Sequence, residues 1–223
     1  TLVYHAGTQD RKHIVVYDFG GGTFDVSIVR MEAGVIEVLS SKGDTQLGGD
    51  DLDALLMNYV ADKFQKAHGI DLRADLSSKY RLLLSCEQAK QKLSTQETVE
   101  IVEEFIAEKD GSPLNLQASL SRQKYEEMIM PLVDRTIRCV DEALRDAKMT
   151  AAQIDDLVLV GGSTRTPLVE SRLREEFRRE PSRAVDPDLA VALGAGVQAA
   201  MLAGQKVGPV LVDVTGHTLG IEA

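Results

Sequence analysis

The chain has 223 residues, of which 43% are hydrophobic and 27% are charged, a balance typical of a globular protein rather than a disordered one. It carries 35 acidic against 25 basic side chains, a formal charge of −10 that argues against nucleic acid as a partner. No apolar run approaches the roughly 18 residues of a membrane span, so no membrane partner is expected either.

The first part of the chain predicts a β-meander. Short β-type runs at 14–17, 24–29 and 35–39 are separated by a glycine turn at 18–23 and by Gly34. We therefore expect a hairpin followed by a third strand.

The middle of the chain predicts an inserted, helix-rich α+β subdomain at about 51–120. A helical apolar period runs from Asp50 to near Gly69, and a second covers about 76–93. Two strands, at 99–107 and 114–120, flank a turn at 110–113. Ser121 is a plausible N-cap for the long helix that follows, to about residue 148.

The last part predicts alternating strands and helices. The run 154–160 ends in four apolar residues, as buried parallel strands do, and a helix is expected at about 167–177. Asp186-Pro187 should open a helix rich in Ala and Gly, which ought to pack closely on something. Strands are expected at 210–214 and 217–221. The whole order predicts a mixed α/β fold.

Two cysteines, Cys86 and Cys139, lie in helical patterns without C-x-x-C spacing. Such residues are most simply explained as buried, reduced thiols, which fits a cytoplasmic location. Because the first residue is Thr1 rather than Met, we expect a processed or truncated product.

The run at 18–25 is the first candidate site. Glycine without a Cβ lets backbone N–H groups close on an anion, Thr23 adds a hydroxyl, and Asp18 could hold a hydrated Mg²⁺. The run is neither a P-loop nor a dinucleotide fingerprint, because a strand rather than a helix follows it. A plain glycine-rich hairpin turn is the alternative.

The run at 161–165 is the second candidate. Its two glycines would let a flat ligand approach the backbone, and Arg165 could stack on a base. A strand-to-helix turn with a solvated arginine explains the same residues.

Two further groups are weaker. Glu87, Lys90 and Ser94 share one helix face and could bind ribose hydroxyls and ring nitrogens, although a solvated polar stripe with a Glu–Lys pair is the simpler explanation. Gly48 and Gly49 could place N–H groups near a phosphate, or could simply begin a helix.

Read together, these runs resemble the seventy-kilodalton heat-shock chaperone family of the DnaK type. The similarity lies in 16–28, 43–51, 158–165 and 186–198, in this order along the chain. It implies an actin-like ATPase (ribonuclease H-like) lobe with the inserted subdomain. Residues 1–206 would be the second lobe of the nucleotide-binding domain. Residues 207–223 would be the interdomain linker and the first residues of the peptide-binding domain.

The resemblance also implies roles for single residues. Asp18 and Thr23 would be catalytic, with Asp18 near Mg²⁺ through water. ATP or ADP would be bound by Gly20, Gly21, Gly22, Thr23, Gly48 and Gly49 at the phosphates, by Glu87, Lys90 and Ser94 at the adenosine, and by Gly161, Gly162, Ser163 and Arg165 at the base, with Asp188 close by. Gln91 stands where many members carry a stacking arginine, so stacking would rest mostly on Arg165.

The implied function is ATP-driven binding and release of unfolded polypeptide. A J-domain co-chaperone would bind near 37–47, a nucleotide-exchange factor would bind the inserted subdomain, and 210–212 would be the coupling strand. Since the first lobe's catalytic groups have no counterpart here, the chain alone should hydrolyse ATP negligibly. A small-molecule kinase of the same superfold and a non-catalytic actin-like scaffold are the rivals.

Overall fold

The computed structural model describes residues 11–182, 184–205 and 210–213. The chain divides into two compact units. Unit 1 comprises Thr1–Gly48, Asp134–Arg165 and Val169–Ala223, and unit 2 comprises Gly49–Val133 and Thr166–Leu168. The inserted subdomain expected at about 51–120 lies within unit 2.

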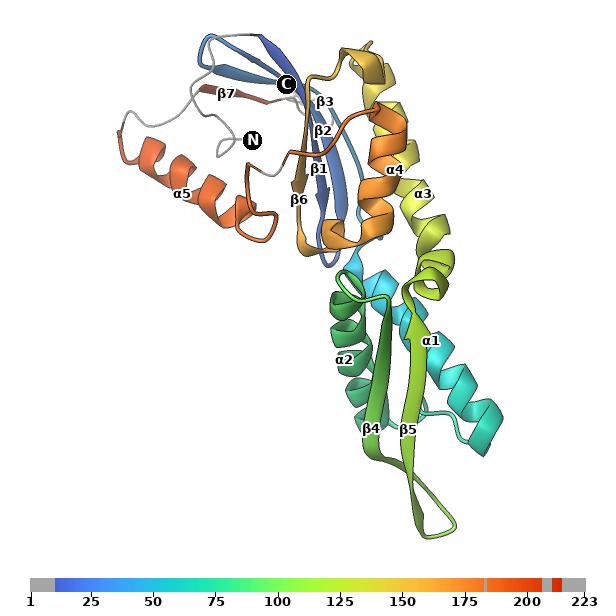
Figure 1. Ribbon diagram of the computed structural model, residues 1–223. Helices are drawn as coiled ribbons and strands as arrows, with labels where there is room; N and C mark the ends of the chain where they lie inside the picture. Colours follow the sequence, from blue (N-terminus) through green and yellow to red (C-terminus); the bar gives the residue numbers. More distant parts are fainter. Residues whose placement is uncertain (1–10, 183, 206–209, 214–223) are drawn as a thin grey trace, which may run out of the picture. The chain divides into compact units, whose positions relative to one another are not determined.

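Unit 1 is built on a five-stranded sheet with the order β6-β1-β2-β3-β7 (Figure 1). The strands are β1 (Lys12–Phe19), β2 (Phe24–Glu32), β3 (Val35–Asp44), β6 (Asp156–Val160) and β7 (Val210–Val212). The first three form the predicted antiparallel meander, and β6 pairs with β1 in parallel, as its apolar end indicated. β7 adds to β3 in parallel. Val214 and the strand expected at 217–221 lie outside the described residues.

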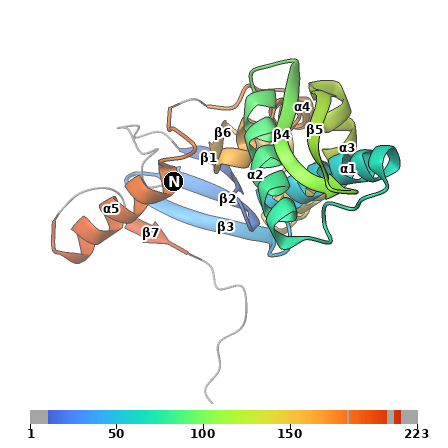
Figure 2. The ribbon, with the colours of Figure 1, turned by 90° about the horizontal axis from the view of Figure 1, so that it is seen from below.

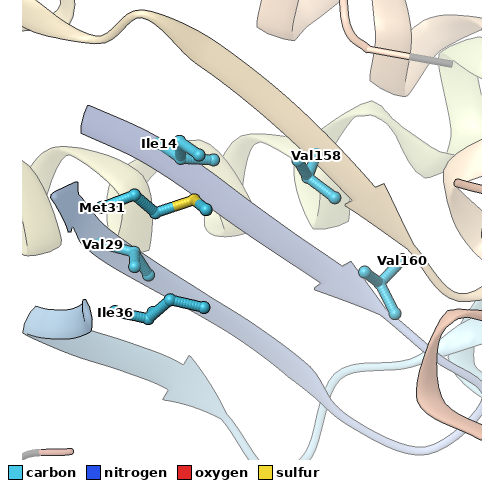
Figure 3. Close-up of a cluster of buried hydrophobic side chains, with 6 residues drawn as sticks. All are labelled: Ile14, Val29, Met31, Ile36, Val158 and Val160. Atoms are coloured by element: carbon cyan, nitrogen blue, oxygen red, sulfur yellow. The ribbon is translucent and has the colours of Figure 1, made fainter. Parts of the chain in front are cut away.

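Two layers of apolar side chains cover the two faces of this sheet. On one face, the rings of Tyr17, Phe19 and Phe24 pack together, and the Tyr17 hydroxyl lies 2.6 Å from Thr136 Oγ1 on α3 (Arg122–Asp146). Because side chains alternate along a strand, the neighbouring residues form a second cluster on the other face. Figure 3 shows it: Ile14, Val29, Met31, Ile36, Val158 and Val160.

Helices lie against both faces. The second half of α3 and α4 (Pro167–Phe177) cover the ring-bearing face, joined by a hydrogen bond from Arg172 to Asp134. On the other side lies α5 (Ala190–Leu202). Its assigned range begins at Ala190, but the turn that leads into it opens at Asp186-Pro187, as expected. The Asp186 carbonyl accepts from the Ala190 N–H at 3.0 Å, and the Asp186 carboxylate accepts from the Asp188 N–H at 3.0 Å, as an N-cap side chain does.

The expected close packing of α5 is wrong for the described chain. None of its residues is buried, and Val191 and Leu202 are 65% and 80% exposed. Only the start of the helix meets the sheet, where Ala190 packs on the second cluster. Small side chains permit a helix to pack closely, but among the described residues no element packs along α5.

Unit 2 matches its predicted elements. It contains α1 (Gly49–His68), α2 (Leu76–Leu93), the hairpin of β4 (Thr98–Lys109) and β5 (Ser112–Ser121), and the first half of α3 (Figure 2). The predicted N-cap at the start of α3 is confirmed, because Ser121 Oγ accepts from the Lys124 N–H at 3.2 Å. Within the described residues, none of the helices combines the length and the apolar character that crossing a membrane requires.

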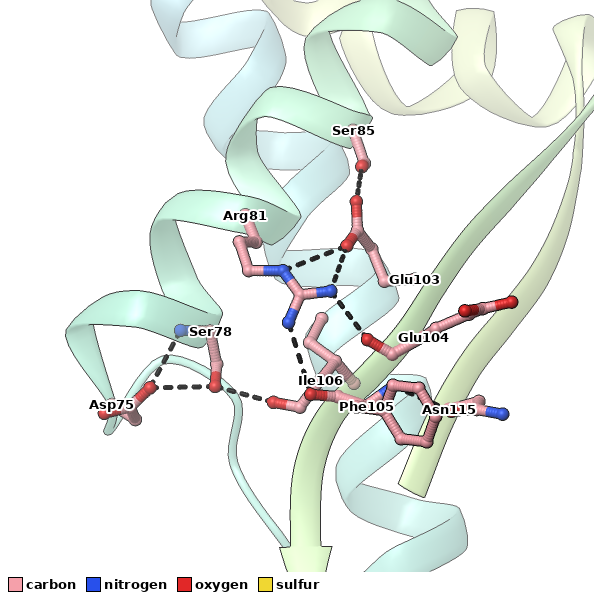
Figure 4. A network of polar contacts seen from close by, with 9 residues as sticks. All are labelled: Asp75, Ser78, Arg81, Ser85, Glu103, Glu104, Phe105, Ile106 and Asn115. Atoms are coloured by element: carbon pink, nitrogen blue, oxygen red, sulfur yellow. Dashed lines mark hydrogen bonds and ion pairs between the residues drawn. The ribbon is translucent and has the colours of Figure 1, made fainter. Parts of the chain in front are cut away.

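A bulge in β4 is the main irregularity of unit 2. Phe105 has a φ of +51°, a left-handed conformation that is unusual for a bulky residue. Figure 4 shows how the bulge is held: the Arg81 guanidinium donates to the Glu103 carboxylate and to the carbonyl groups of Glu104 and Phe105. The Phe105 N–H donates to the side-chain oxygen of Asn115 at 2.7 Å.

Candidate functional site

The first and second candidate runs lie side by side in unit 1. β1 and β6 are parallel neighbours, so their carboxyl ends reach the same edge of the sheet and the bends that follow them meet. Gly161 has a φ of +86°, and a Cβ there would lie 2.4 Å from the Phe19 carbonyl oxygen. Ser163 Oγ donates to the Gly20 carbonyl at 3.0 Å. Only glycine at 161 permits this approach.

Gly48 joins the same bend from β3. A Cβ on Gly48 would lie 2.0 Å from the Gly21 carbonyl oxygen, so the two backbones are in direct contact. Gly21, Gly22 and Thr23 are exposed at this contact. Three glycine-bearing segments, far apart in the sequence, therefore meet around a small and open piece of backbone, an arrangement that suits an anion such as phosphate.

Two carboxylates flank the glycine bend. Asp18 and Asp25 are paired across β1 and β2, so their side chains share one face of the sheet. Burial raises the pKa of Asp18, and the charge of Asp25 raises it further. The pKa of Asp25 is also raised by burial, against a hydrogen bond from the Thr23 side chain.

Asp25 received no role in the sequence interpretation. The signal was available, because Asp18-Phe19 and Phe24-Asp25 are symmetric about the turn and hairpin pairing must place the carboxylates opposite one another. Two such carboxylates fit Mg²⁺, which is usually held by one or two of them together with water and phosphate oxygens. In the described part of the chain, no group of three or more His, Cys, Asp or Glu side chains could hold a metal ion.

Arg165 is exposed but is paired with an acidic loop. Its Nε and Nη2 donate to Asp188 Oδ2 at 3.0 and 2.7 Å, and Nη2 also donates to Asp186 Oδ1 at 2.9 Å. The Gly161 N–H donates to the Pro187 carbonyl at 3.0 Å, which ties this loop to the bend. Asp188 thus lies beside Arg165, and Asp186 is a further partner that the sequence interpretation missed.

The polar face of α2 belongs to unit 2. Glu87, Lys90 and Ser94 are all partly buried. The expected Glu87–Lys90 pair is not the main contact of Lys90, whose Nζ donates to Asp53 Oδ2 at 2.6 Å and to the Gly49 carbonyl at 3.3 Å. Glu87 accepts a hydrogen bond from Gln91, and Ser94 caps the end of α2.

β7 borders a groove in unit 1, on the face of the sheet where α5 begins. The Val210 N–H donates to the Gly34 carbonyl at 3.0 Å, and Leu211 pairs with Ile36. The groove has a volume of about 350 Å³, and its lining includes Asp18, Ser27, Leu211 and Asp213. Leu211, from the segment predicted as a coupling strand, therefore lines the same groove as Asp18, a candidate catalytic residue.

Comparison with known proteins identifies the family. The family model described as "Hsp70 protein" matches residues 1–223. Two relatives, each named "Chaperone protein DnaK" and found in two strains of Thermus thermophilus, are 45% and 44% identical over 223 residues. The match covers 99% of this chain but 36% of each relative, so the chain spans about a third of their length. The mixed α/β fold and these matches agree with the resemblance drawn from the sequence, and the chain belongs to the Hsp70 family.

Proposed function

We propose that this chain is the ATP-binding half of the ATPase domain of a molecular chaperone, which couples ATP hydrolysis to the binding and release of unfolded polypeptide. The observation that carries the proposal is the meeting of the Gly20–Gly22 bend with Gly48 and Gly161 in unit 1. A packed glycine cluster with exposed backbone is costly to maintain unless something approaches it closely. Family membership supports a nucleotide as that ligand.

The phosphates would be bound by backbone N–H groups, which need no net positive charge on the protein. In this proposal the bend at Gly20–Gly22 with Thr23 contacts the β- and γ-phosphates, and Gly48 and Gly49 contact the phosphate chain as well. The Thr23 hydroxyl, through its hydrogen bond to Asp25, keeps that carboxylate oriented at the bend.

Asp18 and Asp25 would hold Mg²⁺ through water. Bound there, the ion would neutralise charge that develops on the phosphate oxygens. Asp18 is partly buried with a raised pKa, so it is suited to accept a hydrogen bond, and then a proton, from a water molecule that attacks the γ-phosphate. The remaining charge stabilisation would have to come from groups outside this chain, which is why we expect negligible turnover from the chain alone.

The nucleoside would be bound by two sets of residues. Glu87, Lys90 and Ser94 would contact the adenosine from α2. Gly161, Gly162 and Ser163 would present backbone to the base, and Arg165 would stack on it. The hydrogen bonds from Arg165 to Asp186 and Asp188 support this role, because they fix the plane of the guanidinium group before a base binds.

We assign residues 1–206 to the second lobe of the nucleotide-binding domain and 207–223 to the linker and the start of the peptide-binding domain. The pairing of β7 with β3 supports 210–212 as the coupling strand. The proposal includes a cytoplasmic location, a J-domain co-chaperone near 37–47 and a nucleotide-exchange factor on the inserted subdomain.

Calorimetric titration with ADP and Mg²⁺, together with a phosphate-release assay, tests the proposal. We expect weak, saturable ADP binding and negligible ATP turnover. Gly48→Ala should abolish binding, since its Cβ collides with Gly21, whereas Gly196→Ala, which meets no atom within 4 Å, should bind as the parent chain does. Turnover like that of a complete chaperone, or an absence of ADP binding, would overturn it.

A further inference from the structure

A largely buried ion pair connects α1 and α2 in unit 2. The Lys90 ammonium donates to Asp53 Oδ2 at 2.6 Å and to the Gly49 carbonyl at 3.3 Å. The Asp53 and Lys90 side chains are only 7% and 14% exposed. An ammonium group has three N–H donors, so these two contacts leave one donor for another acceptor.

Lys90 is the main group that compensates the charge of Asp53. The other carboxylate oxygen, Oδ1, is buried and has no hydrogen-bond partner among the described residues. Burial raises the pKa of Asp53, while the hydrogen bond and the charge of Lys90 lower it. Burial also raises the pKa of the Cys86 thiol to about 12, and the charge of Asp53 contributes to that rise. Asp53 therefore lies in a poorly solvated place, where its carboxylate is paired with the Lys90 ammonium.

A buried ion pair of this kind contributes little to the free energy of unfolding. Removing two charges from water costs roughly what their attraction returns, so well-packed apolar residues would join two helices at least as well. What the pair does supply is a fixed ammonium group. A lysine on a four-carbon stem is otherwise mobile and would lose that freedom on binding a ligand.

We propose that Asp53 is a positioning residue for nucleoside recognition, which anchors Lys90 so that its remaining N–H donor is directed at a ribose hydroxyl of an adenine nucleotide. The inference rests on the proposed function, because that function places Lys90 at the adenosine. Asp53 itself need not touch the ligand. Its effect on binding passes through Lys90.

Asp53→Asn tests the inference in the full chain. The amide keeps the size and an acceptor oxygen but loses the charge that holds the ammonium. ADP affinity, measured by chemical-shift titration so that weak binding is accessible, should fall about five- to tenfold, the effect expected of weakening one charge-assisted hydrogen bond. Affinity for inorganic diphosphate, which has no ribose, should stay within about twofold.

Two comparisons separate positioning from structure. In a Lys90→Met background, Asp53→Asn should cost no further ADP affinity, because Asp53 acts through the lysine. Glu103→Gln, which breaks the Arg81–Glu103 pair elsewhere in unit 2, is the matched control and should leave ADP affinity unchanged. If Asp53→Asn fails to fold, Asp53→Glu keeps the charge and displaces the ammonium, and it should again weaken ADP more than diphosphate.

The outcomes distinguish the two proposals. If the parent chain binds no ADP, the proposed function and this inference both fail. If the parent binds ADP and the Asp53 variants bind it equally well, the inference alone fails. It fails as well if ADP and diphosphate weaken together, or if the loss persists without Lys90.

Discussion

Replacing Gly161 by alanine gives the sharpest test of how the two glycine bends are packed. The residue has a φ of +86°, where an L side chain costs about 1–2 kcal/mol. The new Cβ would also lie 2.4 Å from the Phe19 carbonyl oxygen and 2.9 Å from the Gly20 nitrogen. Both atoms are backbone, so relief requires β1 or β6 to shift, and overpacking of this kind costs about 1–3 kcal/mol. The free energy of unfolding of unit 1 should therefore fall by about 2–5 kcal/mol.

Gly34→Ala is the matched control. Its φ is +78°, nearly the same, but no atom lies within 4 Å of the added Cβ. It should cost the backbone strain alone, about 1–2 kcal/mol. Urea unfolding followed by circular dichroism, with amide exchange of β1 and β6 to report on unit 1, measures both variants. Equal losses at the two positions would show that the bend at 161 does not press on the bend at 20, and the reasoning would be refuted.

Three further predictions concern unit 1. Because the pKa of Asp18 is raised in the folded chain, its ionisation lowers the free energy of unfolding as the pH rises above 3.8, the ordinary pKa of an aspartate. Asp25→Asn removes the neighbouring charge, so the variant should be more stable than the parent between about pH 4 and 7 but not at about pH 3. Urea unfolding midpoints measured at each pH would show this difference. Arg165→Met should weaken ADP binding in calorimetry yet change the unfolding free energy by less than about 1 kcal/mol, because its ion pairs are half exposed; a large stability loss would contradict this. Val210→Pro removes the N–H that donates to Gly34 and should speed amide exchange along β3, while unchanged exchange would mean that β7 contributes nothing to the sheet edge.

Periodic patterns predicted most of the elements, because amphipathic periods and glycine turns are local properties. α1 and α2 begin and end within about a residue of their patterns, and the Ser121 cap holds the start of α3. Asp186-Pro187 likewise marks the turn that leads into α5, because Asp186 accepts from the Asp188 N–H through its side chain and from the Ala190 N–H through its carbonyl.

What the sequence could not predict depends on contacts between distant residues. The bulge at Phe105 is set by Arg81 on α2, and no local pattern contains that information. Asp53 lies beside the apolar stripe of α1, but nothing near it in the sequence indicates that its partner is Lys90. The approach of Gly161 to Gly20 followed only from placing β1 and β6 as parallel neighbours.

The measurement that most directly tests the account is a titration of the isotope-labelled chain with ADP and Mg²⁺, followed by backbone amide chemical shifts. The account predicts that the N–H signals of Gly21, Gly22, Gly48 and Gly162 move together and saturate with one dissociation constant. Shifts confined to other surfaces, or glycine signals that stay in place while ADP binds, would contradict it.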